Sequence, residues 1–176
     1  MAGYPTHSQI RAARSMLGLK QSELASKASI TRSVLLGLER PSRKLPDNSA
    51  LFHLRAAIEA EGLSLLDATE NAGEGVRWKE PSGKLWVDCL RHGRAMLGYS
   101  LDDLAEKSGV GRYVIARVEG GKLRRTPEQS VRRLRDALFE QGVIILNEDE
   151  HVGAGVRLRF GFGKKDLLAP GVRPSA

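Results

Sequence analysis

The sequence predicts a mainly α-helical protein made of two similar helical domains, each followed by a short β-hairpin (an α+β arrangement). Three observations support this expectation. Shifted by 80 positions, the chain matches itself without a gap from about Gln9 to Arg77. Within each copy, apolar residues recur at helical spacing and are interrupted by glycines. After these helices, the apolar residues follow the shorter period of a strand.

The internal repeat matches residues of several kinds. The segment MLG at 16–18 recurs at 96–98, and the pattern GxGVR at 73–77 recurs at 153–157. Core, turn and charged positions therefore all repeat, which chance alternation of apolar residues does not produce. We expect two copies of one domain, at 1–80 and 81–163, because a solenoid needs at least three units. The glycine- and proline-containing stretch 164–176 is expected to be a disordered tail.

The helix boundaries of each copy follow from capping residues. The first helix is expected over 8–17 and again over 88–97, ended by Gly18 and Gly98. In the second copy, Ser100 begins the next helix with Asp103 three residues later, close to a capping box, and Gly109 ends it.

The fourth helix of the second copy has a clear start signal. Thr126 is expected at its N-cap and Pro127 at its first helical position. Strands are then expected at 143–146 and 156–160, and at 63–66 and 76–78 in the first copy. Because an isolated hairpin is only marginally stable in water, we expect the two hairpins to pair with each other or, in a homodimer, with those of a second chain.

Composition narrows the classes of function. The net charge of +7 suits a polyanionic partner, while 5% aromatic residues argue against single-strand binding by base stacking. Cys89 is the only cysteine, which excludes an intrachain disulfide and a cysteine-based zinc site. No signal core or membrane span is visible, so a cytoplasmic location is expected. We expect no metal, no cofactor and no enzymatic activity, because no nucleophile–base set or phosphate loop stands out.

The third helix of the second copy has two different faces. Its inner face carries Val114, Ile115 and Val118, at the spacing of a buried helical stripe. Its outer face carries Arg112, Tyr113, Ala116 and Arg117, which have no evident core role. A short helix pair whose second member presents long cationic side chains favours entry into a DNA major groove. The alternative is an ordinary solvated helix face.

At residues 14–41 and 94–121 the chain resembles the XRE family, the Cro and phage-repressor type of helix-turn-helix domain. The matching pattern is R-x-x-L-G, then L-A, a turn residue, and E-x-G or its equivalent. The resemblance implies two tandem lambda-repressor-like domains. It also implies structural ion pairs between the first and third helices, Arg14 with Glu39 and Arg94 with Glu119.

The resemblance further implies which residues contact DNA. The base-reading positions of the family fall on Arg32, Ser33, Leu36 and Gly37, and on Arg112, Tyr113, Ala116 and Arg117. The phosphate-binding positions fall on Gln21, Arg40, Arg43, Lys44, Lys122, Arg124 and Arg125.

Several residues depart from the family pattern. In the first copy, Lys20 replaces the usual capping hydroxyl, Ser29 replaces the turn glycine, and the apolar Leu36 lies on the expected outer face. The second copy is expected to be the better reader, since Arg112 and Arg117 can each bond guanine bidentately. The first copy could read a thymine methyl with Leu36, contact only the DNA backbone, or serve as a structural partner.

These features predict a sequence-specific double-stranded DNA-binding regulator of transcription. Its two units would bind successive major grooves of an imperfect palindrome with unequal half-sites. The alternative is an antitoxin or anti-activator that uses this fold mainly for protein–protein interaction, with the apolar hairpins docking a partner.

Overall fold

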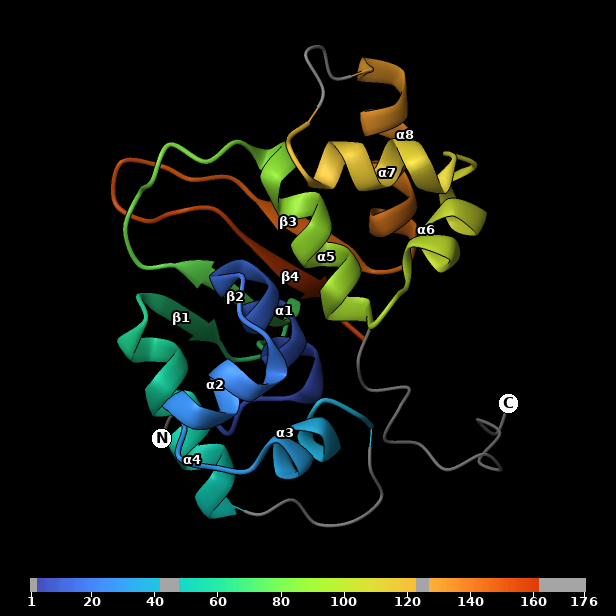
Figure 1. Ribbon diagram of the computed structural model, residues 1–176. Coiled ribbons are helices and arrows are strands. Elements are labelled where there is room, and N and C mark those ends of the chain that lie inside the picture. The colour runs from blue at the N-terminus through green and yellow to red at the C-terminus, as the bar shows by residue number, and fades with distance from the viewer. Residues whose placement is uncertain (1–2, 42–47, 123–126, 162–176) are drawn as a thin grey trace, which may run out of the picture.

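The computed structural model describes residues 3–41, 48–122 and 127–161 (Figure 1). The predicted phosphate-binding residues Arg43, Lys44, Arg124 and Arg125, the predicted cap Thr126 and the predicted tail 164–176 lie outside these ranges. The first repeat contains α1 (His7–Leu17), α2 (Gln21–Lys27), α3 (Arg32–Leu38), α4 (Asn48–Ala60), β1 (Leu63–Leu66) and β2 (Ala72–Trp78). The second contains the 3-10 turn η1 (Trp86–Cys89), α5 (Leu90–Leu97), α6 (Leu101–Ser108), α7 (Arg112–Glu119), α8 (Glu128–Glu140), β3 (Val143–Leu146) and β4 (Gly155–Arg159).

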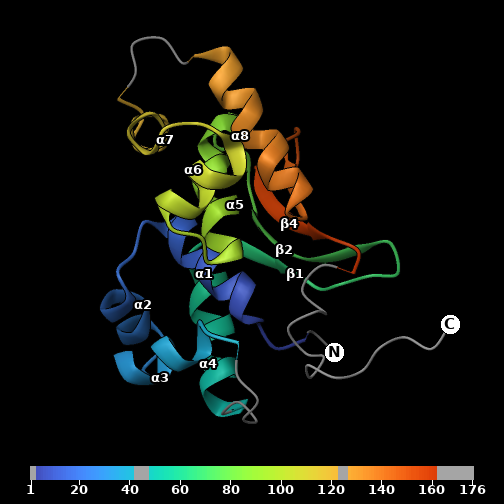
Figure 2. The same ribbon diagram turned by 90° about the vertical axis from the view of Figure 1, so that its right-hand side faces the viewer.

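The fold is mixed α+β, with one four-stranded antiparallel sheet in the order β1-β2-β4-β3. The hairpins of the two repeats therefore pair with each other within the chain, which was one of the two expected arrangements. Figure 2 shows the sheet along one side of the molecule and the helices α2, α3 and α7 on the other, with α1 and α5 between them.

The central pair of strands has a symmetric register. Val76 lies opposite Val156, and Gly75 and Arg77 lie opposite Arg157 and Gly155. The 80-residue repeat relates Val76 to Val156, and it exchanges the pair Gly75–Arg157 with the pair Gly155–Arg77. A pseudo-twofold axis therefore passes through the Val76–Val156 pair.

The GxGVR pattern forms a reciprocal clasp about this axis. The Nε of Arg157 donates to the carbonyl of Gly73 at 2.7 Å, and the Nε of Arg77 donates to the carbonyl of Gly153 at 3.0 Å. A Cβ added at Gly75 would lie 2.8 Å from a carbonyl oxygen and 2.9 Å from the Arg157 side chain. Glycine is therefore needed where the arginine of the opposite strand crosses the sheet.

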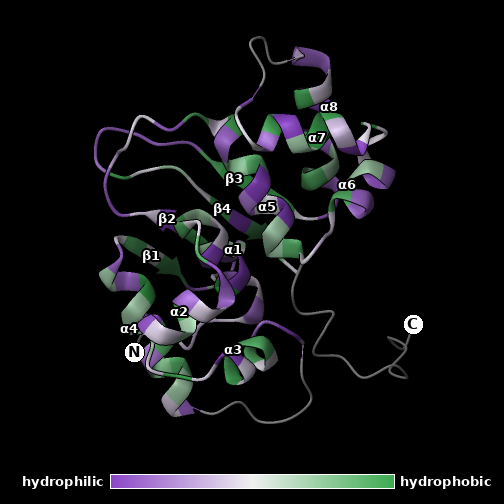
Figure 3. Ribbon diagram, viewed as in Figure 1, coloured by the Kyte–Doolittle hydropathy of each residue, from purple (hydrophilic) through white to green (hydrophobic). Residues whose placement is uncertain are grey.

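One hydrophobic core runs through both repeats. Helix α1 packs against α5, and Ile10, Met16, Leu90 and Met96 from these helices are all buried. The helices alternate hydrophilic and hydrophobic segments, as helices packed on one face do (Figure 3). The predicted domain boundary between residues 80 and 81 lies in an exposed loop, and the division into two domains stays a prediction.

Most helix caps agree with the sequence patterns. Gly18, Gly98 and Gly109 are left-handed, with φ of 66°, 73° and 65°. Ser100 and Asp103 form a reciprocal capping box: Asp103 N–H donates to the serine hydroxyl at 3.1 Å and Ser100 N–H to the carboxylate at 2.7 Å.

Two predicted helix starts were wrong. The expected helix at 88–97 is a 3-10 turn over Trp86–Cys89 followed by α5 from Leu90. Pro127 occupies the N-cap of α8 rather than its first position, because its ψ of 104° is extended and the helix begins at Glu128. None of the described helices combines the length and the apolar character needed to cross a membrane.

Candidate nucleic-acid interface

The third helices of the two repeats, α3 and α7, lie at opposite ends of the molecule but on the same side of it. Figure 2 shows both on the side away from the sheet, and Figure 1 shows them separated by α1 and α5. The pseudo-twofold axis relates them, because it relates the two repeats.

Helix α7 presents the outer face that its sequence predicts. Ile115 and Val118 are buried, and the preceding Val110 fills the corner after α6. Arg112, Tyr113, Ala116 and Arg117 are exposed, Tyr113 at 79%. Their exposure fits both expectations for this face, contact with DNA and an ordinary solvated surface.

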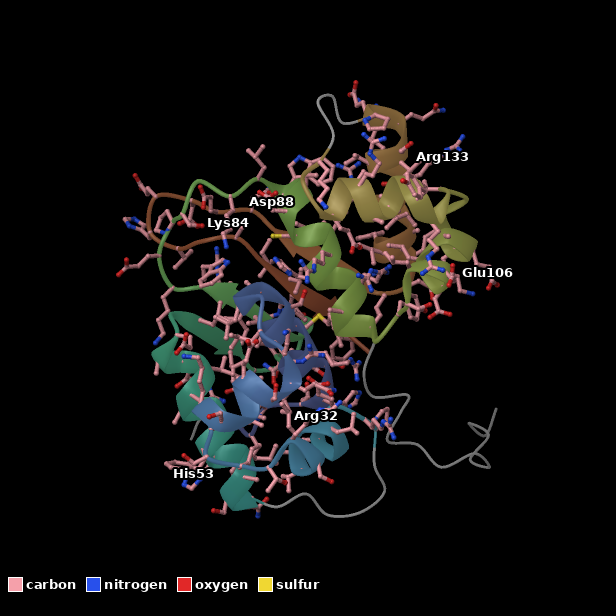
Figure 4. All side chains as sticks on the ribbon, in the orientation of Figure 1. Arg32, His53, Lys84, Asp88, Glu106 and Arg133 are labelled. Atoms are coloured by element: carbon pink, nitrogen blue, oxygen red, sulfur yellow. The ribbon has the colours of Figure 1, made fainter. Side chains whose placement is uncertain are left out.

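Helix α3 matches this geometry only in part. Leu35 is buried, while Arg32, Ser33 and Gly37 are exposed. Arg32 projects from the start of α3 toward α2 (Figure 4). Leu36 was expected on the outer face but is half-buried, because it lines a crevice shared with Leu97 of the second repeat.

The turn before each third helix has the same backbone but different residues. Ser29 has a φ of 53°, close to the 65° of Gly109. Ser29 is the only non-glycine residue with positive φ among those the structure describes. The substitution noted in the sequence thus leaves the turn intact and places strain in it.

The two predicted ion pairs are present, and both are largely shielded from solvent. Arg94 donates to Glu119 through Nε at 2.7 Å and through its terminal nitrogen at 2.6 Å. Arg14 meets both carboxylate oxygens of Glu39 in the same bidentate way. Each arginine also donates to the backbone where the second helix begins, at Leu19 and Tyr99. These contacts hold the third helix against the first.

Gln21 differs from its predicted role. Its amide nitrogen donates to Glu39 at 2.8 Å, and its carbonyl oxygen accepts a long hydrogen bond from Arg32 at 3.5 Å. The side chain therefore extends the Arg14–Glu39 pair. A cationic hollow between α2 and α3 lies beside this pair and is lined by Arg14, Lys20, Gln21, Ser22 and Arg32.

The matching region of the second repeat is more acidic. Asp102 stands at the position of Ser22 and accepts a hydrogen bond from Arg112 at 3.2 Å. Asp103 next to it caps α6, and its bonds to Ser100 lower the pKa of its carboxyl group. One terminal nitrogen of Arg112 is thus bonded to Asp102, and the other N–H groups of its guanidinium remain available to a ligand.

The loop after each third helix is described only at its start. Arg40 and Lys122 are exposed. Together with Arg32, Arg112 and Arg117 they place positive charge along the side that carries α3 and α7.

Across residues 3–41, 48–122 and 127–161, no three His, Cys, Asp or Glu side chains gather in a way that could hold a metal ion.

Two buried titratable groups lie in the second repeat, and one of them contacts the first repeat. The ring of His92 on α5 is hydrogen-bonded through Nδ1 to the hydroxyl of Ser15 on α1, at 2.9 Å. Burial lowers the pKa of His92 to about 4, with Arg91 adding to the shift. Burial also raises the pKa of the Cys89 thiol to about 11, so this cysteine is not a reactive thiolate at neutral pH.

Sequence reasoning missed two contacts at this surface. The bond between Asp102 and Arg112 joins the first turns of α6 and α7, and Arg11 on α1 donates to backbone carbonyls of the second repeat. The repeat alignment matches Arg11 with Arg91 and so does not distinguish them.

Comparison of the chain with protein-family models, with curated proteins and with solved structures found no match in any of the three.

Proposed function

We propose that the protein is a sequence-specific double-stranded DNA-binding regulator of transcription, with two tandem helix-turn-helix units of the XRE type in one chain. The observation that carries this proposal is the placement of α3 and α7. Both present exposed cationic side chains on one side of the molecule, and a pseudo-twofold axis relates them.

This symmetry suits the local symmetry of a DNA duplex. A dimeric repressor places its two reading helices in successive major grooves about one turn apart, roughly 34 Å. In this protein the two units belong to one chain, and the shared sheet and the packing of α1 on α5 hold them together. One chain would therefore bind one operator of two half-sites.

The side chains on α7 have the chemistry for base recognition. Among the residues that the structure describes, no hydrogen bond or ion pair engages the exposed Arg117 guanidinium. A guanidinium that is not engaged by the protein can donate bidentately to O6 and N7 of guanine. Phosphate contacts would come from Arg40 and Lys122, and from the predicted Arg43, Lys44, Arg124 and Arg125. The unequal faces of α3 and α7 imply unequal half-sites.

Selection of bound sequences from a random duplex pool, followed by fluorescence anisotropy on the selected duplex, tests the proposal. We expect one imperfect inverted repeat to emerge, bound by one chain, with an affinity that falls steeply as salt rises. Equal affinity for the selected duplex and an unrelated competitor at moderate ionic strength would contradict sequence-specific binding. Equal protection of two identical half-sites would contradict the inequality of the two repeats.

A second candidate is an antitoxin or anti-activator that acts by binding another protein. Large apolar side chains exposed on the outer helices favour it: Phe52 on α4 is 64% exposed and Phe139 on α8 is 50% exposed. The same anisotropy experiment separates the two candidates. Weak binding of every duplex without sequence preference would favour the second.

A further inference from the structure

Arg11 on α1 donates hydrogen bonds to the backbone of both repeats. Its Nε donates to the carbonyl of Ala95 at 3.0 Å, and one terminal nitrogen donates to the carbonyl of Met96 at 2.6 Å. Its other terminal nitrogen donates to the carbonyl of Glu39 at 2.6 Å. Ala95 and Met96 belong to the last turn of α5, and Glu39 is the C-cap of α3.

One guanidinium therefore bridges the C-terminal ends of two helices from different repeats. Carbonyls at the end of a helix lack intrahelical partners and carry the negative end of the helix dipole, so a cation is favourable there. The planar fork of arginine presents its donors in fixed directions, which a lysine ammonium does not. The bridge therefore restricts the orientation of α3 relative to α5 as well as attracting the two ends.

The glycine at the end of α5 makes room for this bridge. A Cβ at Gly98 would lie 3.2 Å from both Cζ and Nε of Arg11, which is tighter than ordinary contact. The matching Gly18, at the end of α1, would meet nothing within 4 Å. Both glycines have positive φ, so only the close approach to Arg11 distinguishes them.

The bridge has no counterpart on the other side of the pseudo-twofold axis. Arg91, which matches Arg11 in the repeat, is exposed, and no hydrogen bond of its side chain is found within the described ranges. The first repeat thus attaches its third helix to the second repeat through Arg11. The second repeat does not attach α7 to the first in this way.

We propose that Arg11 is a positioning residue that sets the separation and angle of α3 relative to α7, and through them the half-site spacing that the protein accepts. A continuous path supports this. Arg11 joins the end of α3 to α5, and Arg94 on α5 joins the same helix to Glu119 at the end of α7. The spacing consequence depends on the proposed DNA-binding function, whereas the positioning itself does not.

The first experiment measures the positioning without DNA. Spin labels are placed on the exposed α3 and α7 through Ser33→Cys and Ala116→Cys, in a Cys89→Ser background that removes the native thiol. We expect a narrow distance distribution in the otherwise unchanged chain and with Arg91→Gln, and a broadened or shifted one with Arg11→Gln. An unchanged distribution with Arg11→Gln overturns the inference, whatever the protein does with DNA.

The second experiment uses the selected duplex with its spacer lengthened or shortened by one base pair. The ratio of dissociation constants for the altered and optimal spacers should fall roughly tenfold with Arg11→Gln, as expected when a bond to a charged group is lost. Arg91→Gln should keep the original ratio. A ratio unaffected by Arg11→Gln overturns the role of Arg11 in spacing.

The outcomes separate this inference from the proposed function. A broadened distance distribution with no duplex preferred by any variant contradicts DNA reading but upholds the Arg11 bridge. If Arg11→Gln does not fold, Arg11→Lys decides the matter in both experiments. We expect Arg11→Lys to change the distance distribution and the spacer ratio by an intermediate amount, because lysine keeps the charge but not the planar donor geometry. If both measurements equal those of the unchanged chain, the guanidinium geometry is not what positions α3.

Discussion

At the position that Arg117 occupies on α7, the first repeat has Gly37 on α3, and at the position of Tyr113 it has Ser33. The surroundings differ as well. Arg112 is held by an aspartate, whereas the matching Arg32 reaches Gln21, which is itself bonded to Glu39. The third helix of the second repeat therefore presents the cation Arg117, which no described residue engages, at a position where the first repeat has no side chain.

The difference shows that two repeats can share one core pattern and still present different residues to a ligand. Most buried positions, the glycines that end α1 and α5, and the ion pair at the end of the third helix remain matched, because the fold needs them in both copies. The exposed faces of α3 and α7 do not contribute to the core, and their residues differ between the two repeats. We infer that the second repeat supplies most base discrimination, while the first supplies anchoring and the bridge through Arg11.

The largest expected effect comes from breaking the two ion pairs. Arg94→Ala would leave Glu119 buried without its partner and should lower the free energy of unfolding by about 3–5 kcal/mol. Arg14→Ala should cost less, because Arg14 is 27% exposed against 17% for Arg94 and Glu39 keeps a bond from Gln21. Urea unfolding monitored by circular dichroism measures both. Equal losses would mean that Gln21 does not support Glu39.

Acid should destabilise the protein through His92, for which the first repeat has Ala12. The pKa of His92 is about 4 in the folded protein against 6.5 for the ordinary group, so the unfolded chain binds the extra proton first as the pH falls. This contribution is fully present above pH 6.5 and is lost between pH 6.5 and 4, by roughly 3 kcal/mol.

Stability measured at several pH values, with His92→Gln as the matched variant, checks this expectation. Over this range the variant should lose less stability than the unchanged chain as the pH falls. Parallel curves for the two proteins would show that His92 is not held neutral between α1 and α5.

The comparison of the third helices can be tested by exchanging residues between them. Arg117→Ala should cost about 1–3 kcal/mol of binding to the selected duplex and relax preference at one base pair. Gly37→Arg should add discrimination at the matching base pair of the other half-site, since a Cβ at Gly37 meets nothing within 4 Å. Competition binding against single-base variants measures both. Uniform weakening over all variants with Arg117→Ala would indicate a phosphate contact instead.

The smallest effect is expected at the turn that precedes each third helix. Ser29→Gly should raise the free energy of unfolding by about 1 kcal/mol, because it relieves a left-handed conformation that L-residues disfavour. Gly109→Ser should lower it by a similar amount. Thermal unfolding of the two variants makes the comparison, and a loss of stability with Ser29→Gly would show that this serine has a compensating contact.

The sequence by itself was sufficient for features that depend on local spacing. The glycine ends of α1, α5 and α6 and the Ser100–Asp103 capping box involve residue types whose roles are set by their neighbours within a few turns. The Arg–Glu pairs join residues 25 positions apart and were expected from the family resemblance. The inner face of α7 was likewise predictable, since a helix buries residues at a fixed period. The DNA-reading role given to α3 and α7 stays a prediction from resemblance and geometry.

Only the tertiary structure separated residues that the repeat makes equivalent. Arg11 and Arg91 match in sequence, yet one bridges α3 and α5 and the other is exposed. Leu36 has the spacing of an outer-face residue but is half-buried and lines a crevice together with Leu97 of the other repeat. The GxGVR pattern was visible in the sequence, but its function as a clasp required β2 and β4 to pair. Such contacts join distant segments, so they are decided by how two similar units pack together.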